Sequence, residues 1–354
     1  MILNKKLYNP YIRVNDSTPR VMTDVIIALI PAIIMSYLAY GFFPIMVIMI
    51  AIGSAVLAEY LFSYIFFRDT KSIADGSAVI TGILMAFTTG PFTPLYVVAF
   101  GAAAGVIFGK LMWGGLGRNR FNPALVGREF MTIFFPSIML SGAIWQDSSL
   151  KNVESINIFN NEFYNGIFYE VSGAIGEYSP FFLIVGGLFL LYRHRISWHI
   201  PFGMLTAFAI LLFFVSDTIA QFSFGGLFLG AIYMATDMPT STSTNWGKIY
   251  YGVMIGVVCV LCLTNGADKG YFSYSILIMN GFVRPLNWIF RPRVWGNDWD
   301  WLNRTWQLLA ITAAIFVVSF IVIWLDNNDW IMYPVLGFIA YTIIRFVMNG
   351  MKRV

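Results

Sequence analysis

The sequence predicts an all-α, polytopic membrane protein. Its residues are 58% hydrophobic and only 11% charged, whereas soluble domains carry about 25% charged residues. The mean hydropathy is +0.72, and apolar runs follow one another along most of the chain. Lys and Arg cluster in alternate connectors between these runs. Together, these three observations argue against a soluble enzyme and for a bundle of membrane helices.

Twelve apolar runs separated by polar connectors are the candidate spans. The segment 1–20 is polar and basic and lacks the apolar core of a signal peptide, so the first run is expected to remain in the protein. Several runs are shorter than the ~20 residues of a full crossing, which indicates broken or tilted helices. The runs are centred on 25–41, 44–67, 76–88, 94–113, 123–140, 180–192, 200–215, 224–235, 249–263, 271–289, 308–325 and 330–347.

The charges in the connectors predict the orientation. Lys and Arg near helix ends stay on the cytoplasmic side. With a cytoplasmic N-terminus, every clear basic cluster falls on that side, and the long acidic connector 141–178 falls on the other. The clusters are Lys5, Lys6, Arg13 and Arg20, then Arg68 and Lys71, Arg118 and Arg120, Arg193 and Arg195, Lys248, Arg291 and Arg293, and finally Lys352 and Arg353.

Two polar stretches, 114–123 and 237–245, interrupt the apolar pattern. Irregular backbone at membrane depth is tolerated only inside the protein or along a cavity. In addition, the stretch GILMAFTTGP at 82–91 resembles GAIYMATDMP at 230–239. Paired broken helices in two halves are typical of transporters with internal repeats. Chance similarity between two apolar stretches is the alternative.

The glycine-rich stretch is the first candidate site. Free backbone amides beside a cation favour an anion, such as a flavin phosphate, or a ring carbonyl. The alternative is a cytoplasmic turn that needs Gly for its geometry and Arg for the topology. The candidate residues are Gly115, Gly117, Arg118, Asn119, Asn122 and Pro123.

The second candidate site is the polar tract after the run 224–235. Asp237 offers a carboxylate, and Thr240, Ser241 and Thr244 offer hydroxyls, for a hard cation or for hydrogen bonds to a ring. A capped helix start is the alternative. Glu59 lies inside an apolar run, where an ionisable group is costly, so Glu59 and Asp237 are candidates for an ion path. The alternative for Glu59 is a carboxylate hydrogen-bonded to a neighbouring helix.

No hydrolytic or metal site is predicted. The sequence contains no zinc motif, P-loop or nucleophile–His–acid set. The only cysteines, Cys259 and Cys262, lie in one apolar run and are expected to be buried thiols.

Seven stretches, in order along the chain, resemble a known family. They are DVIIALIPA at 24–32, DGSAVITG at 75–82, GKLMWGGLGRNRFNPA at 109–124, GE at 176–177, RISWHIP at 195–201, MATDMPTS at 234–241 and RPRVWG at 291–296. The family comprises the D subunit of the Rnf complex, an ion-translocating ferredoxin:NAD oxidoreductase, and the B subunit of the sodium-pumping NADH:quinone oxidoreductase. The resemblance runs from about residue 11 to residue 296.

The resemblance implies a ten-helix core that holds flavin (FMN or riboflavin) and sits among other membrane subunits. Such a complex passes electrons while it moves Na⁺ or H⁺ across the inner membrane of a bacterium or archaeon, and no nucleic acid is involved. The expected division is an N-terminal arm (1–22), the core (23–290), a Trp-rich linker (291–306) and a two-helix extension (307–354). The extension departs from the family pattern.

A second departure concerns the flavin. Members of the family commonly carry FMN as a phosphoester on the Thr of an SGAT-like motif in the connector that corresponds to 141–178. Here the motif reads SGAI at 141–144 and again at 172–175, so Ile144 and Ile175 stand where the threonine would be. Isoleucine has no oxygen with which to form the ester, so a covalent FMN would need a serine such as Ser148 or Ser149 instead. Any flavin is therefore expected to be non-covalent.

The leading hypothesis is a membrane subunit of a redox-driven, ion-translocating complex, with flavin bound by the two polar stretches. The alternative is a divergent paralogue without electron transfer, acting as a channel-like, transporter-like or scaffolding subunit.

Overall fold

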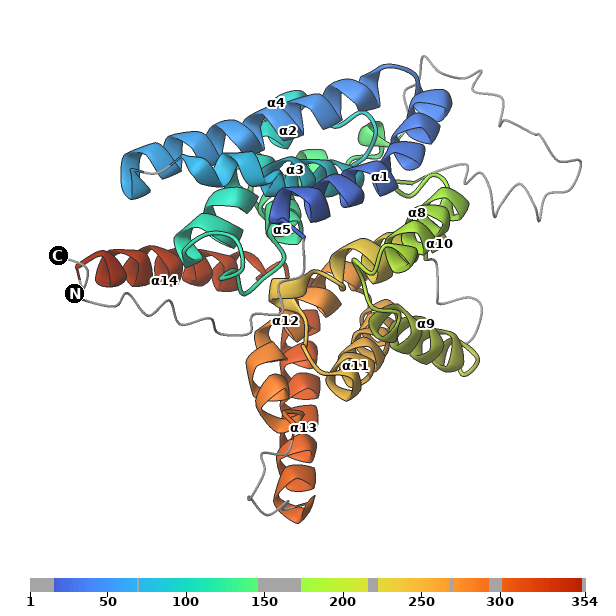
Figure 1. Cartoon of the computed structure of the whole chain (residues 1–354). Coiled ribbons are helices and arrows are strands. Elements are labelled where there is room, and N and C mark those ends of the chain that lie inside the picture. The colour runs from blue at the N-terminus through green and yellow to red at the C-terminus, as the bar shows by residue number, and fades with distance from the viewer. Residues whose placement is uncertain are drawn as a thin grey trace, which may run out of the picture.

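A computed structural model describes residues 16–68, 70–145, 173–215, 222–267, 270–292 and 301–351. Every regular element in these ranges is a helix (Figure 1), which confirms the predicted fold class. Each of the twelve predicted apolar runs forms a helix. Five helices of this part of the chain are long and apolar enough to cross a membrane, and five further apolar helices are shorter. The expected arm up to residue 15, most of the connector 141–178 and residues 293–300 of the expected linker lie outside the described residues.

The first half of the core contains α1 to α5, and several of its helices change pitch. Short π and 3₁₀ segments of this kind frequently mark functional sites inside helices. The helices are α1 (Thr18–Tyr40), α2 (Phe43–Phe62) continued by a π turn (Ser63–Phe67), α3 (Ser77–Phe87), α4 (Leu95–Ala104) continued by π (Gly105–Lys110) and 3₁₀ (Leu111–Trp113) turns, α5 (Pro123–Phe134) and the short α6 (Pro136–Met139).

The second half contains α8 to α12, and two longer helices follow it. α13 begins at Trp301 and therefore includes the last residues of the segment expected to be a linker. These polar and aromatic residues form the first turn of the helix. The helices are α8 (Pro180–Tyr192), α9 (His199–Leu212), α10 (Phe224–Leu229) continued by a π segment (Gly230–Met234), α11 (Asn245–Thr264), α12 (Tyr271–Ile289), α13 (Trp301–Asn327) and α14 (Met332–Met351).

The two halves repeat one packing pattern. α2 packs against α3 and α4, and α4 packs against α5; in the second half, α9 packs against the π segment and α11, and α11 packs against α12. The residue before α1, Ser17, and the residue Arg195 after α8 line the same cavity, so α8 ends where α1 begins. α1 and α8, the first helices of the two halves, therefore run in opposite directions, as an inverted repeat would require.

Glycines bring α9 and α11 into close parallel contact. A Cβ added at Gly252 would lie 2.4 Å from the Ile200 carbonyl oxygen, and one added at Gly256 would lie 2.5 Å from the Met204 oxygen. Small residues at a four-residue spacing allow membrane helices to approach through van der Waals packing. The two helices lie side by side in Figure 1.

Replacing Gly256 with leucine is expected to destabilise the protein by about 1–3 kcal/mol or more, because the added side chain has no room against α9. Thermal unfolding of the purified protein measures the effect. The matched control is Gly53→Leu on α2, where an added Cβ meets nothing within 4 Å. Equal losses of stability in both variants would contradict the close-contact argument.

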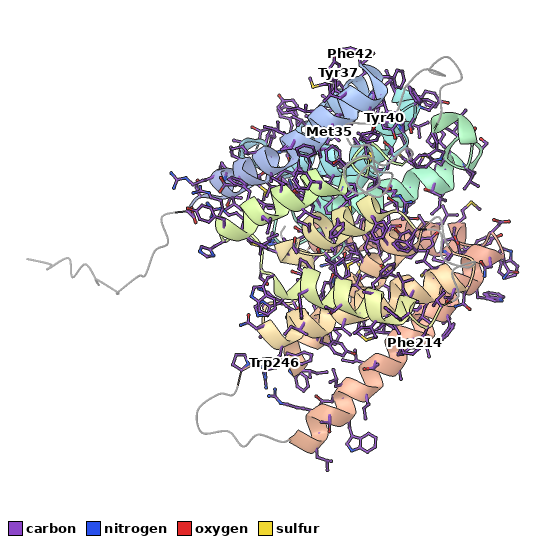
Figure 2. The ribbon with its side chains drawn as sticks, turned by 90° about the vertical axis from the view of Figure 1, so that its right-hand side faces the viewer. Met35, Tyr37, Tyr40, Phe42, Phe214 and Trp246 are labelled. Atoms are coloured by element: carbon purple, nitrogen blue, oxygen red, sulfur yellow. The ribbon has the colours of Figure 1, made fainter. Side chains whose placement is uncertain are left out.

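The outer surface of the bundle is apolar. Figure 2 shows Tyr37 and Phe42 at the end of α1, and Phe214 and Trp246 at opposite ends of the α9–α11 pair. Phe214 is 83% exposed and Trp246 is 75% exposed. Soluble proteins rarely expose large contiguous apolar patches. The surface therefore suits contact with lipid.

Candidate functional site

One cavity of about 390 Å³ lies between the two halves of the core. The starts of α1, α3 and α5 contribute to it from the first half, and the end of the π segment after α10 contributes from the second. Most of its lining is apolar, from residues such as Ile80, Leu84 and Ile232. The polar residues of the lining include Asp16, Ser77, Lys110, Asn119, Asn122, Arg195 and Asp237. A mostly apolar pocket with a few fixed polar groups is the usual form of a cofactor site.

Asn122 joins the two polar stretches predicted as sites. Its Oδ1 caps α5 by accepting a hydrogen bond from the Ala124 amide at 3.0 Å, and its Nδ2 donates to the Met234 carbonyl oxygen at 3.2 Å. Its backbone N–H donates to Asn280 Oδ1 at 2.9 Å, and Asn280 Nδ2 donates to the Thr240 carbonyl oxygen at 3.0 Å. Asn122 and Asn280, which are 158 positions apart in the sequence, are therefore in direct contact.

Asp237 and Asn119 form the polar end of this cavity. The Thr240 hydroxyl donates to Asp237 Oδ2 at 2.8 Å, and the Asn119 side chain also hydrogen-bonds Asp237. Loss of solvent raises the pKa of Asp237 to about 6, although both hydrogen bonds oppose the rise. Asn119 Oδ1 is buried and has no hydrogen-bond partner among the described residues. A buried, unsatisfied amide oxygen indicates a missing donor.

The other predicted site residues divide between several roles. Gly115 and Gly117 have φ of +92° and +81°, which only glycine adopts readily, so they shape the turn. Arg118 lines a second cavity and not the first. Pro123 lines the first cavity, whereas the Thr244 hydroxyl caps α11 by accepting from the Gly247 amide at 3.3 Å. The geometry thus favours the structural alternatives for Gly115 and Thr244. The remaining candidate, Ser241, is buried.

Glu59 forms a buried ion pair that the sequence did not reveal. Lys110 Nζ donates to both carboxylate oxygens of Glu59 at 2.8 Å and also contacts Ser77 Oγ. Glu59 is 0% exposed and Lys110 is 1% exposed. A lysine within the apolar run 94–113 was the signal that could have suggested the partner. The pair links α2, the start of α3 and the π turn after α4 at the wall of the cavity.

Two aspartates and an arginine connect the halves at the mouth of the cavity. Arg195 Nε donates to Asp24 Oδ2 at 2.6 Å, and its Nη1 donates to Asp16 Oδ2 at 2.7 Å. The hydrogen bond from Arg195 is the largest influence on Asp16 and lowers the pKa of that carboxyl. Sequence reasoning missed this network, although Asp24 directly precedes an apolar run.

The two isoleucines that replace the expected threonine are buried at the opposite end of α3. The Ile175 N–H donates to the Thr89 carbonyl oxygen at 3.0 Å, and the Ile144 carbonyl oxygen accepts from the Phe92 N–H at 3.0 Å. Both side chains are buried. They pack in the core and offer no attachment atom to a flavin phosphate.

A second cavity, of about 770 Å³, adjoins the first. Asn119 and Pro239 line both cavities and form their shared wall. The second cavity is polar and basic, with Arg118, Arg120, Arg284 and Arg345 among its lining residues.

The fold and the first cavity define a class of protein: a polytopic helical membrane core whose broken helices meet around a central cavity. The NQR2, RnfD, RnfE family model matches residues 6–296. The chain belongs to this family, which confirms the resemblance found in the sequence. α13 and α14 lie beyond the matched residues.

Three curated relatives are similar to this chain over most of their length. The first is the D subunit of the proton-translocating ferredoxin:NAD(+) oxidoreductase complex of Clostridium ljungdahlii, which is 32% identical over 318 residues, covering 82% of this chain and 95% of that one. The Na(+)-translocating counterpart of Acetobacterium woodii is 32% identical over 305 residues, covering 81% and 94%. The D subunit of the ion-translocating oxidoreductase complex of Stutzerimonas stutzeri is 27% identical over 332 residues, covering 80% and 94%.

Proposed function

We propose that the chain is the D-type subunit of an Rnf-like, ion-translocating ferredoxin:NAD oxidoreductase complex in the inner membrane, with its N-terminus in the cytoplasm. Two relatives of equal identity are named for protons and for sodium ions, so either ion fits the proposal. Other membrane subunits of the complex are its partners. The basic connectors around Arg195 and Arg118 support the orientation.

We further propose that the first cavity binds a non-covalent flavin, FMN or riboflavin. The observation that carries this proposal is the unsatisfied Asn119 Oδ1 beside the Asp237 carboxylate, both at an apolar cavity. A flavin ring presents an N–H donor along one edge, and the Asn119 amide oxygen and the Asp237 carboxylate are both acceptors for it. When bound, the flavin supplies one- and two-electron redox chemistry.

The chain's own residues would hold the ring and exclude water. Ile80, Leu84 and Ile232 provide apolar walls, and Asn122 fixes the start of α5 against the π segment after α10. The proposed ion path passes Asp237. The complete pairing of Glu59 with Lys110 supports a structural role for Glu59 instead.

Acid precipitation of the purified chain is expected to release its flavin into the supernatant, and the denatured chain is expected to show no flavin fluorescence in a gel. The reason is that isoleucine stands at both positions of the attachment motif. Flavin absorbance before and after precipitation measures this.

A fluorescent band at the mass of the chain would contradict non-covalent binding. Absence of flavin from both fractions would instead favour the channel-like or scaffolding alternative for this chain.

A further inference from the structure

Three arginines from separate parts of the chain line the second cavity, and two of them lie over one tryptophan ring. The Arg345 guanidinium carbon lies 4.3 Å from the centre of the Trp113 ring, and that of Arg120 lies 5.3 Å from it. Arg284 is close enough to contribute, with Arg345, to lowering the pKa of Arg120, after the larger effect of burial. All three arginines line the cavity.

These positive charges have no counter-charge in the described part of the chain. None of its ion pairs includes Arg120, Arg284 or Arg345. Arg120 Nε and Arg345 Nη1 are buried and have no hydrogen-bond partner there. Partly buried like charges repel each other, and unsatisfied donors cost free energy. An anion that accepts several hydrogen bonds would remove both costs.

The extension completes this cavity. Arg345 lies on α14, beyond the residues matched by the family model. α14 packs onto the core through aromatic rings: Phe338 stacks on Trp113 at 6.3 Å, and Phe346 lies 5.4 Å from Phe62 at the end of α2. The arginine cluster is therefore particular to a chain that carries this helix.

The surroundings of the cavity favour a lipid as the source of the anion. The π turn after α2 exposes apolar side chains, Tyr64, Ile65 and Phe66, and Phe66 also lines the cavity. An acyl chain can cover this surface while its headgroup enters the cavity. Guanidinium groups match phosphate oxygens with paired hydrogen bonds, and basic pockets between helices on the cytoplasmic side suit anionic headgroups.

We propose that the second cavity binds the phosphate of an anionic phospholipid headgroup between the core and α14, held by Arg120, Arg284 and Arg345. The lipid would thereby fasten the extension to the core. This inference does not depend on the flavin proposed for the first cavity.

The test compares the full chain in nanodiscs of pure phosphatidylcholine with nanodiscs that also contain phosphatidylglycerol. Phosphatidylglycerol is expected to raise the melting temperature of the wild type and to remain bound in native mass spectra. Arg345→Gln is expected to weaken phosphatidylglycerol binding about tenfold through loss of charged hydrogen bonds. Arg345→Lys keeps the positive charge but loses the paired N–H donors of the guanidinium. Its affinity for phosphatidylglycerol should lie between those of the wild type and Arg345→Gln.

The matched control is Arg291→Gln, which removes an arginine that rests on Trp288, outside the cavity; it should bind phosphatidylglycerol like the wild type. If Arg345→Gln does not fold, the exposed Arg284→Gln takes its place. An unchanged response of the cavity variants would overturn the proposal. So would equal stabilisation of the wild type by inorganic phosphate in pure phosphatidylcholine, because the anion would then need no lipid.

Discussion

Replacing Lys110 with methionine is expected to destabilise the protein by about 3–5 kcal/mol. The substitution leaves Glu59, which is fully buried, with its charge unpaired inside the bundle. Ser77, the other polar contact of Lys110, donates its hydroxyl to Asp75 and does not replace the lost positive charge. Thermal unfolding and the yield of monodisperse protein in detergent measure the loss.

The decisive control is the double variant Glu59→Gln with Lys110→Met, which removes both charges and should recover most of the lost stability. Lys248→Met is the matched single control, since Lys248 has no ion pair among the described residues. Simply additive losses in the double variant would contradict a buried pair. If the recovered double variant also drives ion transport in the assembled complex, Glu59 is not an ion ligand.

Asp237→Asn is expected to weaken flavin binding about 10–100-fold while making the flavin-free protein more stable above pH 6. The pKa of Asp237 is about 6, above its ordinary value of 3.8, so the folded state prefers the protonated form. Ionisation therefore removes stability as the pH rises from about 4 to about 6. Asparagine cannot ionise and therefore avoids this loss. By linkage, the loss in free energy of unfolding is at most about 3 kcal/mol, and it is smaller because Asp237 is partly exposed.

Two pH profiles test this prediction. The difference in melting temperature between Asp237→Asn and wild type should be small near pH 4 and reach its full size above pH 6. Flavin affinity of the wild type should rise over the same range as the carboxylate forms, whereas the affinity of Asp237→Asn should stay flat. Thr244→Ala is the control, because that hydroxyl caps α11 and is not expected to contact the flavin. A flat wild-type profile would argue against Asp237 as a flavin partner.

The sequence predicted the helices and the polar breaks well, because both are local properties. Apolar length marks each helix, and the residues around Asn122 and Asp237 stood out because they interrupt apolar runs. The orientation, the site residues and the division into core and extension stay predictions.

The pairings between distant segments could not be predicted. Glu59 and Lys110 were both recognisable as ionisable residues inside apolar runs, but no spacing in the sequence placed one against the other, 51 residues away. The contact depends on how α2 and α4 pack. Arg345 carried no signal at all, because a basic residue near the end of a last helix is ordinarily explained by topology.

The wall that Asn119 and Pro239 share between the two cavities has a thermodynamic consequence. If an occupant of one cavity shifts this wall, it changes the affinity of the other cavity by some factor, and the second occupant must change the first affinity by the same factor. The lipid composition of the membrane would then change the affinity for the proposed cofactor, and bound cofactor would change the affinity for the lipid. A terminal helix outside the family's common core would in this way tune an electron carrier that it does not touch.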